Sequence, residues 1–300
     1  MWNRREWLMA GAGMAAPLFA KGRVDKSWIS VITDECAKTQ EDSIRFANQY
    51  GLSFIELRGV PGGGGRYDAQ PRDFLREARK QFDDAGLRVS FLNTGLLKYK
   101  LPGTVPRNPK DARRDTQQRF DHRLDNLKRS IEAAHILGVD KVRVFTFHRV
   151  ANPLELMPRL AEIIGEMADV AADEKVHLLI ENEASTNVAT CAEMAAFTKL
   201  LPSPAIGINW DPLNAVRYHE KPMPDGYEKL PKKRIENVQI KGKSVLTGYH
   251  QLLPWAEIFD AMARDGYRGK FGLETHIFGA GQIQASHDSM KEILHIVETS

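Results

Sequence analysis

The segment 178–184, with the sequence LLIENEA, decides the fold because an apolar run ends abruptly in two carboxylates and an amide. The run 178–180 is short and fully apolar, as expected of a strand in a parallel sheet that is covered on both faces. Glu181, Asn182 and Glu183 follow this run directly. In α/β barrels, chemistry gathers at the carboxyl ends of the strands. The pattern therefore predicts a buried strand that delivers polar side chains to a functional site.

Similar short runs recur along the chain, and segments with helical periodicity separate them. Pro71 and Gly86 bracket one such helix, whose expected apolar stripe includes Phe74 and Phe82. Another helix should open with a capping box at Thr190-x-x-Glu193. We expect eight strands, at residues 28–33, 54–57, 87–92, 141–147, 176–180, 205–210, 235–240 and 269–273.

Eight alternating strand and helix units predict an α/β fold, a (β/α)₈ TIM barrel that forms a single domain over residues 21–300. The alternative is an open doubly wound sheet. Such sheets usually carry a glycine-rich phosphate loop after the first strand, and residues 33–36, TDEC, lack it. Two long loops, at residues 59–70 and 98–114, should lie at the mouth of the barrel, either as flaps or as loose insertions.

Three later predicted strands also end in a carboxylate or an amide, as the strand before Glu181 does. Asp211 follows the run 205–210, Gln239 lies near the end of 235–240, and Glu274 follows 269–273. One strand and helix unit separates each of these residues from the next, so all should reach one shared mouth with Glu181. Converging carboxylates repel each other unless positive charge is present. A divalent cation would satisfy the whole set, whereas the alternative gives each acid its own Arg or Lys partner.

The chain resembles the xylose isomerase-like superfamily of sugar isomerases and epimerases. Four segments carry the resemblance: LLIENEA at 178–184, INWDPLNA at 208–215, RIENVQIKGK at 234–243 and DGYRGKFGLETH at 265–276. The resemblance implies that Glu181, Asp211, the position of Gln239 and Glu274 bind one divalent metal ion.

Two positions depart from the pattern of that superfamily. Gln239 stands where a histidine is usual, and an all-oxygen ligand set favours Mg²⁺ or Mn²⁺ over Zn²⁺. Asn214 stands where the zinc endonucleases of the superfamily place another histidine ligand. Because Asn214 cannot supply that ligand and few histidines lie near the other strand ends, DNA repair is not expected.

The resemblance also implies that Glu181 and Glu274 act as the acid and base. Because a metal-bound carboxylate is a poor base, Glu183 is a second candidate, unless it is a plain loop acid. Lys241 could neutralise an enolate, and a surface lysine is the alternative.

Further residues near the strand ends are candidate substrate contacts. His148, His276, Arg217 and Asn182 could bind substrate hydroxyls or acidic groups, and each could also be structural. Glu56 and Arg58 could form an ion pair or line the mouth. Trp210 and Phe147 are expected to pack in the core rather than stack on a sugar ring. The two cysteines, Cys36 and Cys191, are expected to be unpaired thiols.

These residues support three functions. The first is a metal-dependent isomerase or epimerase of a small sugar or keto-sugar that forms an enediolate. The second is a lyase or dehydratase that acts on a keto-sugar, inositol derivative or glycoside with the same metal. The third is a barrel that binds carbohydrate without turnover, which the exchange of histidine for Gln239 would favour.

The first twenty residues have the character of a twin-arginine signal peptide. The pair Arg4-Arg5 precedes an apolar run over residues 7–20, which is too short to span a membrane as a helix. We therefore expect the twin-arginine translocase as a partner and the periplasm as the destination, with a membrane tether if the signal stays uncleaved. A net charge of +3 is too small to indicate nucleic-acid binding. Related barrels often form homodimers, so the resemblance allows a dimer.

Overall fold

The protein is described here from a computed structural model. The structure describes residues 23–112 and 115–300, so the expected signal peptide lies outside the described residues. Among the described residues, no helix has both the length and the apolar content needed to cross a membrane.

All strands of the described chain belong to one parallel sheet that curls into a barrel. The order is β1-β8-β7-β6-β5-β4-β3-β2, and a parallel bridge between Ile32 and Glu56 brings the two edges together. This arrangement confirms the predicted (β/α)₈ TIM barrel. The strands are β1 (Ile29–Val31), β2 (Phe54–Leu57), β3 (Arg88–Leu96), β4 (Lys141–Val144), β5 (His177–Glu181), β6 (Ile206–Trp210), β7 (Ile235–Lys241) and β8 (Lys270–Glu274).

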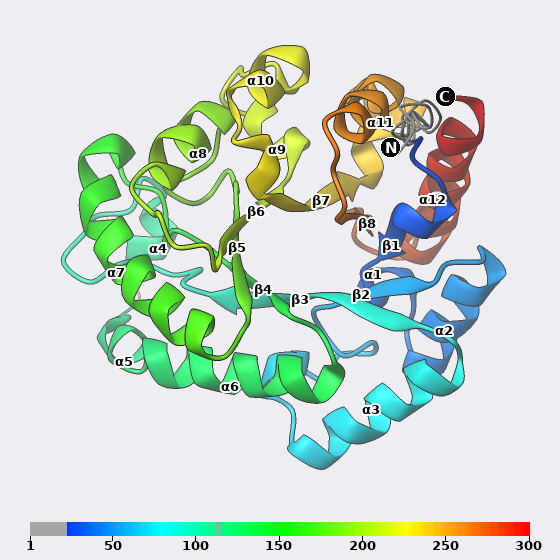
Figure 1. The fold of residues 1–300 in the computed structure, drawn as a ribbon, viewed down its shortest axis with the longest axis horizontal. Helices are drawn as coiled ribbons and strands as arrows, with labels where there is room; N and C mark the ends of the chain where they lie inside the picture. The colour runs from blue at the N-terminus through cyan, green and yellow to red at the C-terminus, as the bar shows by residue number, and fades with distance from the viewer. Residues whose placement is uncertain (1–22, 113–114) are drawn as a thin grey trace, which may run out of the picture.

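Helices surround the strands on the outside, as Figure 1 shows. They are α1 (Thr33–Cys36), α2 (Gln40–Gln49), α3 (Arg72–Asp84), α4 (Pro109–Ala112), α5 (Gln117–Asp121), α6 (Arg123–Leu137), α7 (Pro153–Asp173), α8 (Cys191–Thr198), α9 (Pro212–Val216), α10 (Tyr227–Lys229), α11 (Trp255–Arg264) and α12 (Gln282–Thr299). Single turns occur at Lys26–Trp28, Tyr67–Ala69, Pro222–Gly226, Lys232–Arg234, Gly242–Ser244 and Thr247–Tyr249.

Local sequence signals predict most of these helices, but the buried face of α3 was predicted wrongly. Thr190 and Glu193 form the predicted capping box at the start of α8. In α3, however, the buried stripe contains Leu75 and Phe82, and Phe74 is exposed. The predicted stripe began one residue too early because Phe74 and Leu75 are both apolar, and only the packing of the helix separates them.

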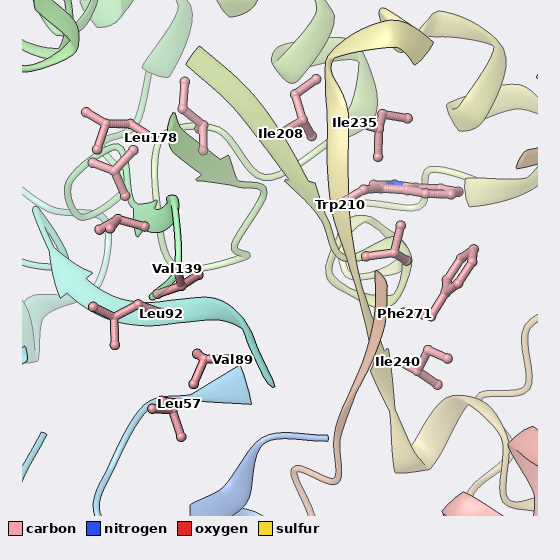
Figure 2. Close-up of a cluster of buried hydrophobic side chains, with 14 of the residues drawn as sticks. Leu57, Val89, Leu92, Val139, Leu178, Ile208, Trp210, Ile235, Ile240 and Phe271 are labelled. Carbon is pink, nitrogen blue, oxygen red and sulfur yellow. The ribbon is translucent and has the colours of Figure 1, made fainter. Parts of the chain in front are cut away.

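The apolar core lies mainly between the barrel wall and the helices. Side chains that point outward from the strands fill it, among them Val238 and Ile240 of β7, which are fully buried. Figure 2 shows part of this layer, including Trp210 and Phe271. Trp210 stacks on Tyr227 with ring centroids 5.4 Å apart, so it packs in the core as predicted.

The inside of the barrel is polar, unlike the layer around it. The carboxylate of Glu56 lies fully buried there and accepts hydrogen bonds from Ser30 Oγ at 2.9 Å, Asn93 Nδ2 at 2.8 Å, Gln239 Nε2 at 2.8 Å and Asn237 Nδ2 at 3.2 Å. Burial raises the pKa of Glu56, and these four donors oppose that shift and satisfy the oxygens of the buried carboxyl group. Glu56 is therefore not paired with Arg58, and the proposed ion pair between them is wrong.

Cys36 and Cys191 are both buried free thiols, as expected.

Gly272 of β8 faces this buried carboxylate, and a Cβ at that position would overlap with Glu56 Oε1. We predict that Gly272→Ala lowers the free energy of unfolding by about 1–3 kcal/mol, because the packed interior cannot move aside. Urea unfolding would measure the loss. Gly248→Ala is the matched control, since Gly248 is exposed and a Cβ there meets no atom within 4 Å. Equal midpoints for the two variants would contradict the close approach of Gly272 to Glu56.

Candidate functional site

Glu181, the last residue of β5, lies in the mouth of the barrel with its own cationic partner. Arg143 of β4 donates from Nη1 to Glu181 Oε2 at 2.9 Å, and Asn209 Nδ2 donates to the same oxygen at 2.7 Å. Both ionic side chains are almost fully buried. Arg143 is also bound to the backbone oxygens of Thr94 and Asn93. Both hydrogen bonds end at Glu181 Oε2, so they leave Oε1 of the same carboxylate unoccupied.

Lys241 stands at the centre of the remaining acids. Its Nζ lies 2.7 Å from Asp211 Oδ2 and 3.8 Å from Glu274 Oε2, and it donates to Asn214 Oδ1 at 3.0 Å. The side chains of Lys241, Asp211 and Glu274 are all buried. The ammonium group is therefore the point at which the strand-end carboxylates of β6 and β8 meet.

Arg58 provides the third positive charge of the mouth. Its guanidinium contacts Glu274 Oε1 at 3.0 Å, Asp34 Oδ2 at 3.0 Å and Glu35 Oε1 at 2.8 Å. His276 closes this group, because its Nδ1 lies 3.4 Å from Glu274 Oε1 and its backbone N–H donates to Glu35 Oε2. Arg58 thus lines the mouth, which was one of its two predicted roles.

These charges shift each other's proton affinities. Burial lowers the pKa of Lys241, but Asp211 and Glu274 outweigh burial and raise it, so the ammonium stays charged. Burial likewise raises the pKa of Glu274, but Lys241, His276 and Arg58 bring it well below its usual value. For Asp211, burial dominates and raises the pKa to about 6 although Lys241 opposes the shift.

Glu183 is held on the loop that follows β5. Lys98 Nζ lies 3.2 Å from Glu183 Oε2, and Ser185 donates to Oε1 from its backbone N–H and its hydroxyl, both at 3.2 Å. Burial raises the pKa of Glu183, but the ammonium groups of Lys98 and Lys241 outweigh it and lower the pKa to about 2. A carboxylate with so low a pKa is a weak base.

Gln239 lies deeper in the barrel than the sequence suggested. In the register of β7 and β8, Gln239 pairs with Gly272, and Lys241 pairs with Glu274. The side chain of Gln239 donates from Nε2 to Glu56, so its amide orientation is fixed and Oε1 is the remaining polar atom. That oxygen is buried and accepts no hydrogen bond.

The residues predicted to bind substrate occupy different settings. His276 is half-buried beside Glu274, and His148 is half-buried with Nδ1 3.6 Å from Asp111 Oδ1. Arg217 is exposed at the rim. The amide of Asn182 bonds to the backbone N–H and C=O of Asp211, at 2.8 and 2.7 Å. Asn182 therefore fixes the backbone of Asp211, and its contact with a substrate stays a prediction.

The structure allows a test of whether these residues suit a divalent cation. Within the predicted set, the buried oxygens Gln239 Oε1 and Glu274 Oε2 accept no hydrogen bond, and Asp211 Oδ2 has only its ion pair with Lys241. All ligand atoms of this set would be oxygens, as Mg²⁺ and Mn²⁺ prefer. The donor chemistry therefore fits such an ion. A bound cation would share Asp211 and Glu274 with the ammonium of Lys241.

One compact group of potential ligands occurs in the described part of the chain, and it differs from the predicted set. The ligand atoms of Glu35, Glu274 and His276 lie within 4.8 Å of one another. Glu181 and Asp211 are outside this group, although both interact electrostatically with Lys241. The metal ligand set Glu181, Asp211, Gln239 and Glu274 remains a prediction.

Sequence reasoning missed Arg143, Asp34 and Glu35. Arg143 had a visible signal, because it is a charged residue inside the apolar run 141–147 and alternates with outward-facing valines. Asp34 and Glu35 come directly after the first predicted strand, residues 28–33, as Glu181 comes directly after the predicted strand 176–180. That position at a strand end was the available signal for both.

Comparison with known families gives a match over most of the chain. The sequence model described as xylose isomerase-like TIM barrel matches residues 44–293. No curated protein matches the chain significantly.

Solved structures share the fold at low sequence identity. The apo form of 3-keto-D-glucoside 4-epimerase from E. coli has a TM-score of 0.67 and 14% identity, and the match covers 91% of this chain and 100% of that chain. A xylose isomerase-like TIM barrel protein from Mycobacterium smegmatis in complex with magnesium has a TM-score of 0.66 and 18% identity, covering 91% and 98%. The probable 3-DHS dehydratase from Bacillus anthracis has a TM-score of 0.67 and 16% identity, covering 88% and 98%.

The buried pair of Arg143 and Glu181 gives a prediction about stability. Arg143→Met should lower the free energy of unfolding by about 3–5 kcal/mol, because it leaves a buried carboxylate without its counter-charge. Adding Glu181→Gln should recover a large part of this loss, since a neutral amide needs no cation. Urea unfolding of the single and double variants would measure both effects. A double variant no more stable than Arg143→Met would show that the charge of Glu181 does not depend on Arg143.

Proposed function

The chain belongs to the xylose isomerase-like TIM barrel family, and we propose that it isomerises or epimerises a small sugar or keto-sugar through an enediolate. The observation that carries this proposal is the group of strand-end carboxylates around Lys241. Asp211 and Glu274 contact the ammonium, and Glu181 and Glu183 lie within its electrostatic reach. Such a mouth combines proton acceptors with a cation that can stabilise an oxyanion.

We place a divalent cation, Mg²⁺ or Mn²⁺, in this proposal. Glu181, Asp211, Gln239 and Glu274 would hold it through their oxygens. When bound, such an ion polarises a carbonyl group and fixes neighbouring hydroxyls of the substrate. Glu56 would keep the Gln239 amide turned so that Oε1 remains available, because Nε2 is used in the bond to Glu56.

The proton transfer is assigned to Glu181 and Glu274. One glutamate, as the carboxylate, takes the proton from the carbon next to the carbonyl. The carboxylic acid that forms, or the other glutamate in its protonated form, returns a proton to the enediolate on the neighbouring carbon or on the other face. Glu181 Oε1 and Glu274 Oε2 are the oxygens outside the hydrogen bonds that fix these side chains. The ammonium of Lys241 would stabilise negative charge on the enediolate oxygen. Glu183 ranks behind them as a base because both of its oxygens are engaged, Oε2 by Lys98 and Oε1 by the N–H and hydroxyl of Ser185.

The named activities of the structural neighbours agree with this substrate class. One neighbour is an epimerase named for a 3-keto-D-glucoside, and another is named a dehydratase. The lyase alternative is kept as an outcome of the test below.

Solvent deuterium tests the proposal directly. The protein, with Mn²⁺, is incubated with keto-sugars in D₂O, and mass spectrometry measures the deuterium on the carbon next to the carbonyl. We expect incorporation by the wild-type protein. Glu181→Gln and Glu274→Gln should each slow it by about 100-fold or more, because a carboxamide cannot accept the proton. Elimination of water or an aglycone would identify a lyase instead.

Glu236→Gln is the matched control for these variants. This variant carries the same Glu→Gln change at the opposite end of the barrel, where Glu236 bonds to His177 Nδ1 at 2.9 Å. Its exchange rate should equal that of the wild type. Binding of keto-sugars without any exchange would refute the enzyme and leave a carbohydrate-binding barrel.

A further inference from the structure

A cavity of about 460 Å³ lies beside the mouth, between the long loop after β3 and the loops after β4, β5 and β6. The loop after β3 contributes Arg107 and Asp111, and the loops after β4 and β6 contribute Arg149 and Arg217. The volume lies within the usual range of small-molecule pockets. Three arginines from three separate loops thus line one small-molecule-sized space.

Arg149 is held in place and does not have a free charge. It makes two ion-paired hydrogen bonds to Glu193, at 2.6 and 3.1 Å, and its guanidinium lies 4.4 Å from the centroid of the Tyr218 ring. It also donates to the backbone oxygens of Thr186 and Asn187. Arg149 therefore builds the wall of the cavity, and Glu193 neutralises its charge.

Arg107 and Arg217 differ from Arg149 in having no such partner. Within residues 23–112 and 115–300, neither guanidinium makes an ion pair with a carboxylate, and both side chains are exposed. Asp111 is the one acid among the lining residues, and it lies 3.6 Å from His148 Nδ1. The cavity therefore has a net positive charge. Arginine is well suited to bind phosphate or carboxylate groups through two parallel hydrogen bonds.

The cavity adjoins the proposed reaction site. Ser185, which lines the cavity, donates to Glu183 Oε1 from both its N–H and its hydroxyl. Glu183 in turn pairs with Lys98 and interacts with Lys241. A sugar bound at Lys241 could therefore extend one end past Glu183 into the cavity.

From this placement we infer that the substrate carries an anionic group, a phosphate or a carboxylate, which Arg107 and Arg217 bind in the cavity. The inference rests on the proposed function, because it names the substrate class of that same site. The shared chemistry is an oxyanion on the end of the sugar away from the carbonyl that reacts.

Calorimetric titration of the full protein tests this inference without requiring turnover. The probes are D-fructose 6-phosphate, D-glucuronate, inorganic phosphate and uncharged D-fructose. We expect at least one of the two sugar anions to bind about tenfold or more tightly than D-fructose, with the advantage falling as salt rises. The phosphate and the carboxylate probes distinguish the two sources of the anion.

The double variant Arg107→Gln/Arg217→Gln should remove this advantage while D-fructose binding stays the same. The matched control is Lys233→Gln/Arg264→Gln, which removes the same charge from two exposed positions away from this cavity. Anion binding that is equal to D-fructose binding, absent, or unchanged in the Arg107/Arg217 variant would overturn the inference.

The two proposals can fail separately. Anion binding that depends on Arg107 and Arg217, without deuterium exchange, would leave the cavity assignment and refute the enzyme. Deuterium exchange with uncharged sugars alone, and no exchange that depends on the two arginines, would support the enzyme and refute the cavity assignment.

Discussion

The positive charge of Lys241 is the constraint on which the mouth of the barrel depends. Asp211 directly follows β6 and Glu274 ends β8, and their oxygens lie 2.7 and 3.8 Å from the same ammonium group. Without the ammonium between them, two buried carboxylates so close to one atom would repel each other strongly in a medium of low dielectric constant. In the same way, Arg143 forms an ion pair with Glu181, and Arg58 forms one with Glu35. These cations let the acids of the mouth lie near one another, although burial raises the pKa of Asp211 and of Glu35.

Below the mouth, the barrel continues this polar arrangement instead of filling with aliphatic side chains. Glu56 accepts four hydrogen bonds there, and one of them sets the orientation of Gln239. Gly272 leaves the space that the carboxylate of Glu56 occupies. The polar interior thus supports the mouth from beneath, and the apolar layer under the helices supplies most of the packing.

Much of this architecture could be predicted from local patterns, because apolar runs, caps and strand ends each have a direct sequence signal. The eight strands and the capping box at Thr190 are examples. What was not foreseen required knowledge of register or of packing. In the β7–β8 ladder Lys241 pairs with Glu274 and Gln239 pairs with Gly272, and a shift of two residues along a strand changes the depth of a side chain in the barrel. The buried face of α3 shows the same limit on a helix, since Leu75 packs inward where Phe74 was expected. Partner choice also depends on the assembled barrel, which is why the pairing of Arg58 with Glu35 rather than with Glu56 was not foreseen.

The most direct test of the central claim replaces Lys241 with methionine and measures Mn²⁺ binding by electron paramagnetic resonance. If the ammonium and a divalent cation share the same carboxylates, Lys241→Met should bind Mn²⁺ about tenfold or more tightly than the wild type, because a competing positive charge is gone. Lys243→Met, two residues further on, is the control and should leave the affinity unchanged. Weaker or unchanged Mn²⁺ binding in Lys241→Met would contradict the claim that these acids converge on one cation site.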